Sequence, residues 1–168
     1  MENEYVDFGP RKKVAKTLAQ NLIKDAGISE APVSLQKIIE FLQKKRAIFI
    51  QRANLSDKIS GLLIVCEQLD QEYTTIVFNE IHPWCRRRFT IAHEIGHLLL
   101  GHTCAPGGNA HNETEANIFA GELLIPTKFI KKDFVKTQNV PELSKLYRVS
   151  GEALSIKLMD ARLLHYND

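Results

Sequence analysis

Residues 88–100 read Arg88-Phe89-Thr90-Ile91-Ala92-His93-Glu94-Ile95-Gly96-His97-Leu98-Leu99-Leu100 and contain the pattern His-Glu-x-x-His. In an α-helix, His93 and His97 lie one turn apart on the same face, where two imidazoles can bind one metal ion. Glu94 follows the first histidine, and its carboxylate can lie close to the ion without binding it. Two nitrogen ligands with a carboxylate that accepts a proton from water are typical of zinc hydrolases.

The residues around this pattern favour a helix. Ala92, Ile95 and Leu99 have helical spacing and form an apolar stripe beside the histidine face. Pro83 suits the first turn of such a helix, and Gly101 suits its end. The competing interpretation is a core helix with two incidental histidines. Buried polar side chains need partners, however, and a metal ion would supply one.

A catalytic zinc site needs a third protein ligand, and the next acidic stretch offers one. Residues 113–126 read Glu113-Thr114-Glu115-Ala116-Asn117-Ile118-Phe119-Ala120-Gly121-Glu122-Leu123-Leu124-Ile125-Pro126, which predicts a helix that Pro126 ends. Glu113 and Asn117 share one face of this helix. Glu113 is therefore the candidate third ligand, and Asn117 is the candidate partner of a ligand histidine. We expect Glu115 to point away into solvent, and a charged helix surface remains the alternative for Glu113 as well.

Together these two motifs resemble the ImmA/IrrE family of metallopeptidases. The resemblance extends upstream to Ile59-Ser60-Gly61-Leu62-Leu63 and downstream to residues 143–154, so that it covers most of the chain after about Pro32. It implies a small zincin-like fold of the gluzincin kind. It also implies cytoplasmic proteolysis of a helix-turn-helix repressor, as in the gene regulation of mobile elements or phages.

The resemblance also implies roles for individual residues. In that family, the two histidines and the first glutamate of the second motif bind zinc, and they correspond here to His93, His97 and Glu113. The glutamate between the histidines is the catalytic base, which corresponds to Glu94. We therefore expect one zinc ion per chain.

The composition agrees with a compact protein and bears on its binding partners and its cellular compartment. The chain has 168 residues, 44% of them hydrophobic, which is enough for a core. The net charge of +2 is too small to indicate nucleic acid or membrane binding by itself. No apolar run approaches a membrane span, and the N-terminus lacks a signal-peptide core. Three widely spaced cysteines favour a reducing cytoplasm over a disulfide framework: Cys66, Cys85 and Cys104.

Two helices and three strands are expected before the histidine motif. The helices are predicted over residues 10–26 and from a cap at Ser34 to the basic cluster at 44–46. The strands are predicted at 47–51, 59–66 and 73–79, with an acidic loop at 67–72. Gly61 is expected where a neighbouring backbone comes close. This order suits an α+β fold in which a small antiparallel or mixed sheet packs on helices, with one sheet edge near the metal available to an extended peptide.

The segment from His102 to Asn112 joins the two motifs and must lie near the metal. Its histidines and cysteine are candidates for extra metal contacts, but three protein ligands and water already complete a catalytic site. His102 and His111 are instead the candidates for stabilising the oxyanion or contacting the substrate. Cys104 is not expected to be a ligand.

After Pro126 the pattern predicts three helices, at residues 128–136, 141–147 and 151–164. The last two resemble a helix-turn-helix. We therefore divide the chain into a zincin-like metallopeptidase domain at 1–137 and a C-terminal helical segment at 138–168 that packs on it. The final helix carries few side chains that could contact DNA, namely Ser155, Lys157 and Arg162. Packing on the protease body is the preferred interpretation, and DNA binding is the alternative.

The sequence thus predicts a zinc-dependent endopeptidase. Glu94 would accept a proton from water as it attacks a peptide carbonyl, and would pass the proton to the leaving amine. The expected substrate is a partner helix-turn-helix repressor, whose cleavage would relieve repression. The alternative is a non-proteolytic zinc-containing regulatory module that binds a repressor or DNA. A purely structural zinc site fits less well because it needs no base and is usually closed by four protein ligands.

Overall fold

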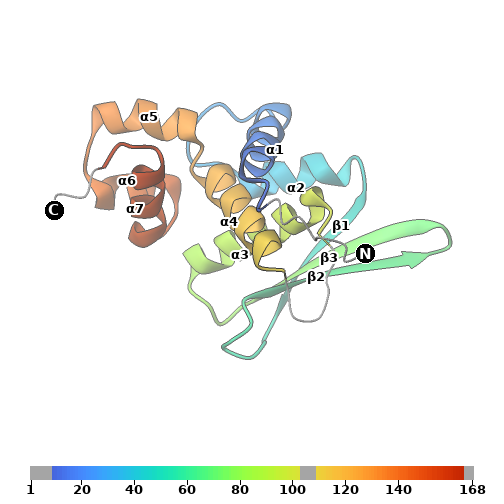
Figure 1. The fold of residues 1–168 in the computed structure, drawn as a ribbon. Coiled ribbons are helices and arrows are strands. Elements are labelled where there is room, and N and C mark those ends of the chain that lie inside the picture. Colours follow the sequence, from blue (N-terminus) through green and yellow to red (C-terminus); the bar gives the residue numbers. More distant parts are fainter. Residues whose placement is uncertain (1–8, 103–108, 165–168) are drawn as a thin grey trace, which may run out of the picture.

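The computed structural model describes residues 9–102 and 109–164 and has an α+β fold (Figure 1). Within these ranges the chain forms seven helices and one three-stranded sheet. The helices are α1 (Lys12–Asp25), α2 (Leu35–Gln43), α3 (Trp84–Leu100), α4 (Ala110–Leu124), α5 (Thr127–Lys136), α6 (Val140–Tyr147) and α7 (Gly151–Asp160). The strands are β1 (Ala47–Ala53), β2 (Gly61–Gln68) and β3 (Gln71–Asn79). Helices α5, α6 and α7 lie at the end of the molecule away from the sheet (Figure 1). The predicted fold class is confirmed.

Local capping explains where several helices begin and end. The Ser34 side chain accepts a hydrogen bond from the Lys37 backbone N–H at 3.3 Å, as its cap position predicts. Gly101 closes α3 with a φ of 69°, a left-handed conformation that glycine adopts without steric cost. The expected end of the last helix at Leu164 is wrong. The chain leaves α7 after Asp160 and turns back, with the Leu163 N–H bonded to the Leu158 carbonyl.

The sheet is mixed and has the order β1-β3-β2. β1 runs parallel to β3, whereas β2 and β3 form an antiparallel hairpin. The predicted acidic loop at 67–72 is wrong, because only Leu69 and Asp70 form the turn. Their φ angles of 51° and 61° are typical of a two-residue turn whose twist matches a hairpin.

Close packing between α3 and α4 holds the two motif helices together. A Cβ atom added at Gly96 would lie 3.0 Å from the Phe119 ring and 3.3 Å from the Cα atom of Ala116. An alanine at position 96 would therefore require Phe119 or the α4 backbone to shift by a few tenths of an ångström. The side chains of both helices join one continuous buried cluster with residues of the sheet and of α1, α2, α5, α6 and α7.

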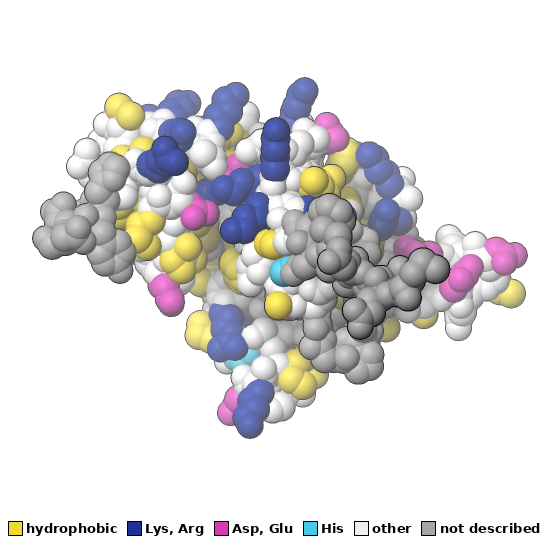
Figure 2. Space-filling model, viewed as in Figure 1, with side chains coloured by type: hydrophobic (Ala, Val, Ile, Leu, Met, Phe, Trp, Pro, Cys, Tyr) yellow, Lys and Arg dark blue, Asp and Glu magenta, His cyan; other side chains and the backbone are white. Residues whose placement is uncertain are grey.

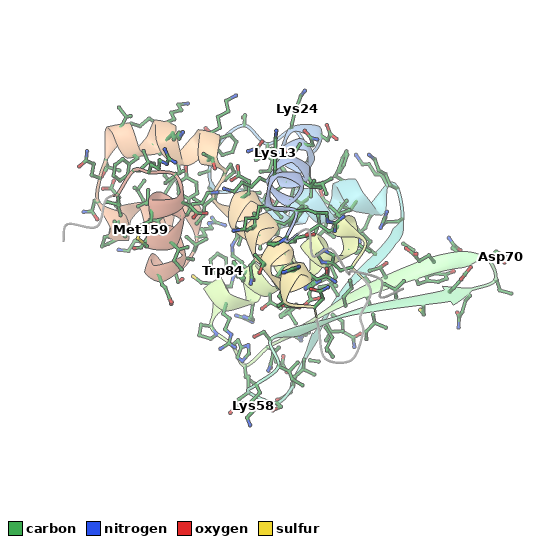
Figure 3. The ribbon with its side chains drawn as sticks, viewed as in Figure 1. Lys13, Lys24, Lys58, Asp70, Trp84 and Met159 are labelled. Carbon is green, nitrogen blue, oxygen red and sulfur yellow. The ribbon has the colours of Figure 1, made fainter. Side chains whose placement is uncertain are left out.

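The molecule has a helical body from which the β2–β3 hairpin projects (Figure 1). Figure 3 shows Asp70 at the tip of this hairpin and Met159 in α7 at the opposite end of the molecule. Figure 2 shows lysine and arginine side chains gathered over α1 and α5, whereas acidic side chains mark the hairpin tip. No helix in the described part of the chain is long and apolar enough to cross a membrane.

Candidate metal centre

The structure brings three predicted ligands together from two helices. His93 and His97 come from α3, and Glu113 comes from the first turn of α4. The Nε2 atoms of the two histidines are 2.9 Å apart. The two carboxylate oxygens of Glu113 each lie 3.3 Å from one of these nitrogens. One donor atom from each of the three residues lies within 4.8 Å of the donor atoms of the other two.

This donor set fits a zinc ion in both chemistry and spacing. A tetrahedral zinc with ligands at about 2.0–2.2 Å holds its donor atoms about 3.3–3.6 Å apart. The observed separations of 2.9 Å and 3.3 Å are close to that range. Two imidazole nitrogens and one carboxylate oxygen form a common catalytic zinc set, which leaves a fourth position open.

The protonation state of the two candidate ligand histidines suits metal binding. Burial is the largest cause that lowers the pKa of both imidazoles, and it outweighs the neighbouring Glu113 carboxylate. The pKa of His97 falls to about 4, to which the proximity of His93 also contributes. Both rings are therefore neutral near pH 7 in the metal-free protein, which is the form that binds metals.

Asn117 lies where the sequence predicted a partner for a ligand histidine. Its side-chain oxygen is 3.0 Å from Nδ1 of His93. An amide oxygen accepts a hydrogen bond, so this contact suits a His93 ring with its proton on Nδ1. The other ring nitrogen, Nε2, then faces Glu113 without a proton.

Glu94 lies beside the three donors but makes no ion pair with them. The residue is 8% exposed. Burial, followed by the negative charge of Glu113, raises the pKa of Glu94 to about 7. A carboxylate with a pKa near neutrality can both accept and release a proton at physiological pH.

A cleft of about 590 Å³ opens over the candidate metal centre. Its walls include the histidines and Glu94 on α3, the start of α4, and residues 58–63 at the start of β2. β2 is an edge strand that pairs only with β3 among the described residues. The first residues of an edge strand therefore lie at the candidate centre.

Gly61 allows β2 to approach α3 this closely. A Cβ atom at this position would lie 2.4 Å from the Thr90 methyl group, 2.7 Å from the Val77 carbonyl oxygen and 3.4 Å from a Glu94 carboxylate oxygen. The predicted close approach at Gly61 is confirmed. The neighbour is the metal-motif helix as well as the adjacent strand.

The two histidines proposed for oxyanion or substrate contact are not among the described residues that line this cleft. His102 is wrongly predicted as an oxyanion donor, because its side chain is only 3% exposed and lies behind His97. His111 is half-buried in the first turn of α4. The role proposed for His111 stays a prediction. Cys104 lies outside the described residues.

Glu115 does not point into solvent, and this expectation is wrong. The residue is 3% exposed, and its carboxylate accepts hydrogen bonds from the Arg11 backbone N–H at 2.6 Å and from the Arg11 guanidinium at 2.8 Å. Burial opposes ionisation, but these hydrogen bonds prevail and lower the pKa of Glu115 to about 2. The helical pattern around Glu115 contained no signal for a partner 104 residues away.

A second buried ion pair joins α4 to α7. Lys157 is one of the three residues that the sequence indicates as candidate DNA contacts. It is 5% exposed and forms an ion pair with the fully buried Glu122. Gln20 and Thr127 also donate hydrogen bonds to that carboxylate. Burial opposes ionisation of Glu122, but these partners outweigh it and lower its pKa. Lys157 therefore holds α7 on the body of the protein and is unavailable to DNA.

The fold and the candidate centre together define a metallopeptidase-like class of protein. The chain belongs to the family of IrrE N-terminal-like domains, Peptidase M78, whose model matches residues 44–159. The resemblance to the ImmA/IrrE family is thereby confirmed. The matched region includes β1 to β3 and every helix from α3 to α7 except the last residue of α7.

A solved structure with a similar fold is a Mycobacterium tuberculosis transcriptional regulator. The TM-score is 0.57 at 16% sequence identity, over 84% of this chain and 44% of that chain. At this identity the similarity shows the fold alone, and the present chain spans less than half the length of that protein. No curated protein matches the chain.

Proposed function

We propose that this protein is a zinc-dependent endopeptidase that cleaves a partner protein. The observation that carries the proposal is the position of Glu94. This buried carboxylate shares one cleft with three convergent metal donors but is not needed to hold the ion. A purely structural metal site has no use for such a group.

In the proposed reaction His93, His97 and Glu113 would hold the ion. A bound zinc ion would supply a Lewis acid for a peptide carbonyl and would lower the pKa of a water molecule to about 7. Glu94 would accept the proton of the attacking water and then deliver it to the leaving amine. Asn117 would keep the ring of His93 in orientation through its contact with Nδ1.

The substrate that we propose is an extended segment of a helix-turn-helix repressor, so that cleavage relieves repression. The edge strand β2 supports an extended segment, because a peptide can add to a sheet edge through main-chain hydrogen bonds. The regulatory role draws on the peptidase family and on the structure with a similar fold, which is a transcriptional regulator. The free thiols of Cys66 and Cys85 support a reducing cytoplasm as the compartment.

The test is co-expression of the protein with a candidate repressor, followed by measurement of the repressor's length on a gel. We expect wild-type protein to shorten it and Glu94→Gln to slow cleavage by a factor of at least about 10²–10⁴. The control is Glu67→Gln, which removes the same charge from the exposed end of β2.

Two outcomes contradict the proposal. Equal cleavage by wild type and Glu94→Gln would show that Glu94 is not the base. Relief of repression by both proteins without any shortening would favour the alternative, a regulatory module that binds a repressor or DNA without cleavage.

A further inference from the structure

We propose that His102, Glu115 and Arg11 form a supporting triad that fixes the ring orientation and tautomer of His97 for metal binding. These are positioning residues, since none of them is among the three converging donors. The inference rests on the metal site of the proposed function and extends it to a second layer of side chains.

The contacts of the supporting triad form an unbroken series. His97 presents Nε2 to His93 and Glu113, and its other nitrogen, Nδ1, lies 2.9 Å from Nδ1 of His102. On the far side of the His102 ring, Nε2 lies 3.0 Å from a carboxylate oxygen of Glu115. Arg11 then donates to that carboxylate through its backbone N–H and its guanidinium.

The chemistry of these groups leaves one consistent arrangement of protons. The neutral His97 ring can bind a metal through Nε2 only if its proton is on Nδ1. That N–H can donate to His102 only if Nδ1 of His102 carries no proton, so the His102 proton must be on Nε2. An ionised Glu115 accepts hydrogen bonds and cannot donate them, and therefore selects this tautomer. Arg11 stays protonated and favours the ionised form of the Glu115 carboxylate.

The end of α3 places His102 in this series. Gly101 adopts its left-handed conformation, and the His102 backbone N–H donates to the carbonyl of His97 at 3.0 Å. This Schellman-type ending folds the chain back, so that the two imidazole rings lie 5.0 Å apart at 71°. The guanidinium of Arg11 also donates to the Leu100 carbonyl at 3.3 Å. One arginine therefore supports both the helix end and the buried carboxylate.

Burial makes this arrangement specific. The side chains of His102 and Glu115 are 3% and 4% exposed. Polar groups at such depth destabilise a fold unless they are paired, and here each ring nitrogen of His102 has a partner. Arg11 lies outside residues 44–159, which match the family model. The segment before α1 thus contributes to the metal centre from outside the matched region.

The first test compares His102→Leu with His102→Asn. The two side chains are similar in size, but only Asn offers an oxygen near the place of Nδ1 that can accept a hydrogen bond from the Nδ1–H of His97. Zinc affinity is measured at fixed pH by competition with a chromophoric chelator. We expect His102→Leu to bind zinc about 10–100-fold more weakly than wild type, and His102→Asn to recover most of that loss. Thermal unfolding of the metal-free variants checks that each is folded.

The second test needs no variant. Long-range ¹H–¹⁵N spectra of the zinc-loaded wild type report which nitrogen of each histidine carries a proton. We expect the proton on Nδ1 of His97 and on Nε2 of His102.

The proposal is overturned if His102→Leu binds zinc as tightly as wild type, if both variants lose affinity equally, or if the spectra place the protons otherwise. Failure of the wild type itself to bind zinc is a different result. It would remove the metal site of the proposed function, and the supporting triad with it.

Discussion

At the scale of single residues, two glutamates separated by one position have opposite surroundings. The Glu113 side chain is 52% exposed and reaches the candidate metal ligands, whereas the Glu115 side chain is 4% exposed and paired with Arg11. Removing the first should affect metal binding more than folding. Removing the second leaves the Arg11 guanidinium and the buried His102 ring without the carboxylate that they share.

We therefore expect Glu113→Ala to lose most of the one zinc ion per chain. Its metal-free form should remain within about 0.5 kcal/mol of wild type in unfolding free energy, because substitutions of exposed side chains usually have small effects. Elemental analysis after gel filtration measures the zinc, and denaturant unfolding in a chelator measures the stability. Glu67→Ala, an exposed change on β2, is the matched control. Full zinc content in Glu113→Ala would rule out Glu113 as the third ligand.

At the scale of elements, the site depends on how closely β2 approaches α3. Two glycines offer a matched comparison. An added Cβ at Gly61 would meet Thr90 at 2.4 Å and the Val77 carbonyl at 2.7 Å, whereas one at Gly121 in α4 would have no neighbour within 4 Å outside its own helix. The same chemical change should therefore have opposite effects at the two positions.

We expect Gly61→Ala to lower the unfolding free energy by about 1–3 kcal/mol, since the strand must move away from the helix. Gly121→Ala should raise it by about 0.5–1 kcal/mol, because alanine is the better residue in a helix interior. Urea unfolding monitored by circular dichroism measures both. A Gly61→Ala protein as stable as wild type would mean that β2 does not lie against α3 in solution.

At the scale of the whole molecule, the C-terminal helices belong to the common core. Leu143, Tyr147, Leu154 and Leu158 are fully buried in the same cluster as residues of α1 and α4. The ion pair of Lys157 with Glu122 adds a polar connection between α7 and α4. The boundary that we predicted between residues 137 and 138 stays a prediction. The family match at 44–159 runs across it.

We expect Lys157→Met to destabilise the protein by about 3–5 kcal/mol at pH 7, because it leaves the Glu122 carboxylate buried without its cation. The pKa of Glu122 is lowered by folding, so the ion pair contributes fully above the ordinary value of 4.5. That contribution is lost as the pH falls through the lower folded pKa. The difference between variant and wild type should therefore shrink in acid.

Chemical denaturation at pH 7 and at pH values below 4.5 measures this dependence. Lys131→Met, an exposed change on α5, is the control and should have little effect at any pH. A constant difference between Lys157→Met and wild type across the pH range would mean that Glu122 is not the group involved.

The sequence by itself determined the features that depend on local spacing. The i, i+4 histidines, the adjacent Glu94 and the shared face of Glu113 and Asn117 all follow from helical periodicity, and the structure brings these side chains together. Ser34 and Gly101 mark helix ends for reasons contained within a few residues. The roles of these residues in catalysis and metal binding remain predictions.

Only the tertiary structure decided which distant groups meet. Glu115 and Glu122 look like surface residues on a helical pattern, but Arg11 and Lys157, 104 and 35 residues away, hold them in the interior. Likewise, no local pattern predicts the strand order β1-β3-β2 or places β2 at the cleft. The physical reason is that periodicity describes which face of an element is apolar. The partner of a buried charge is set by long-range packing, which no single segment encodes.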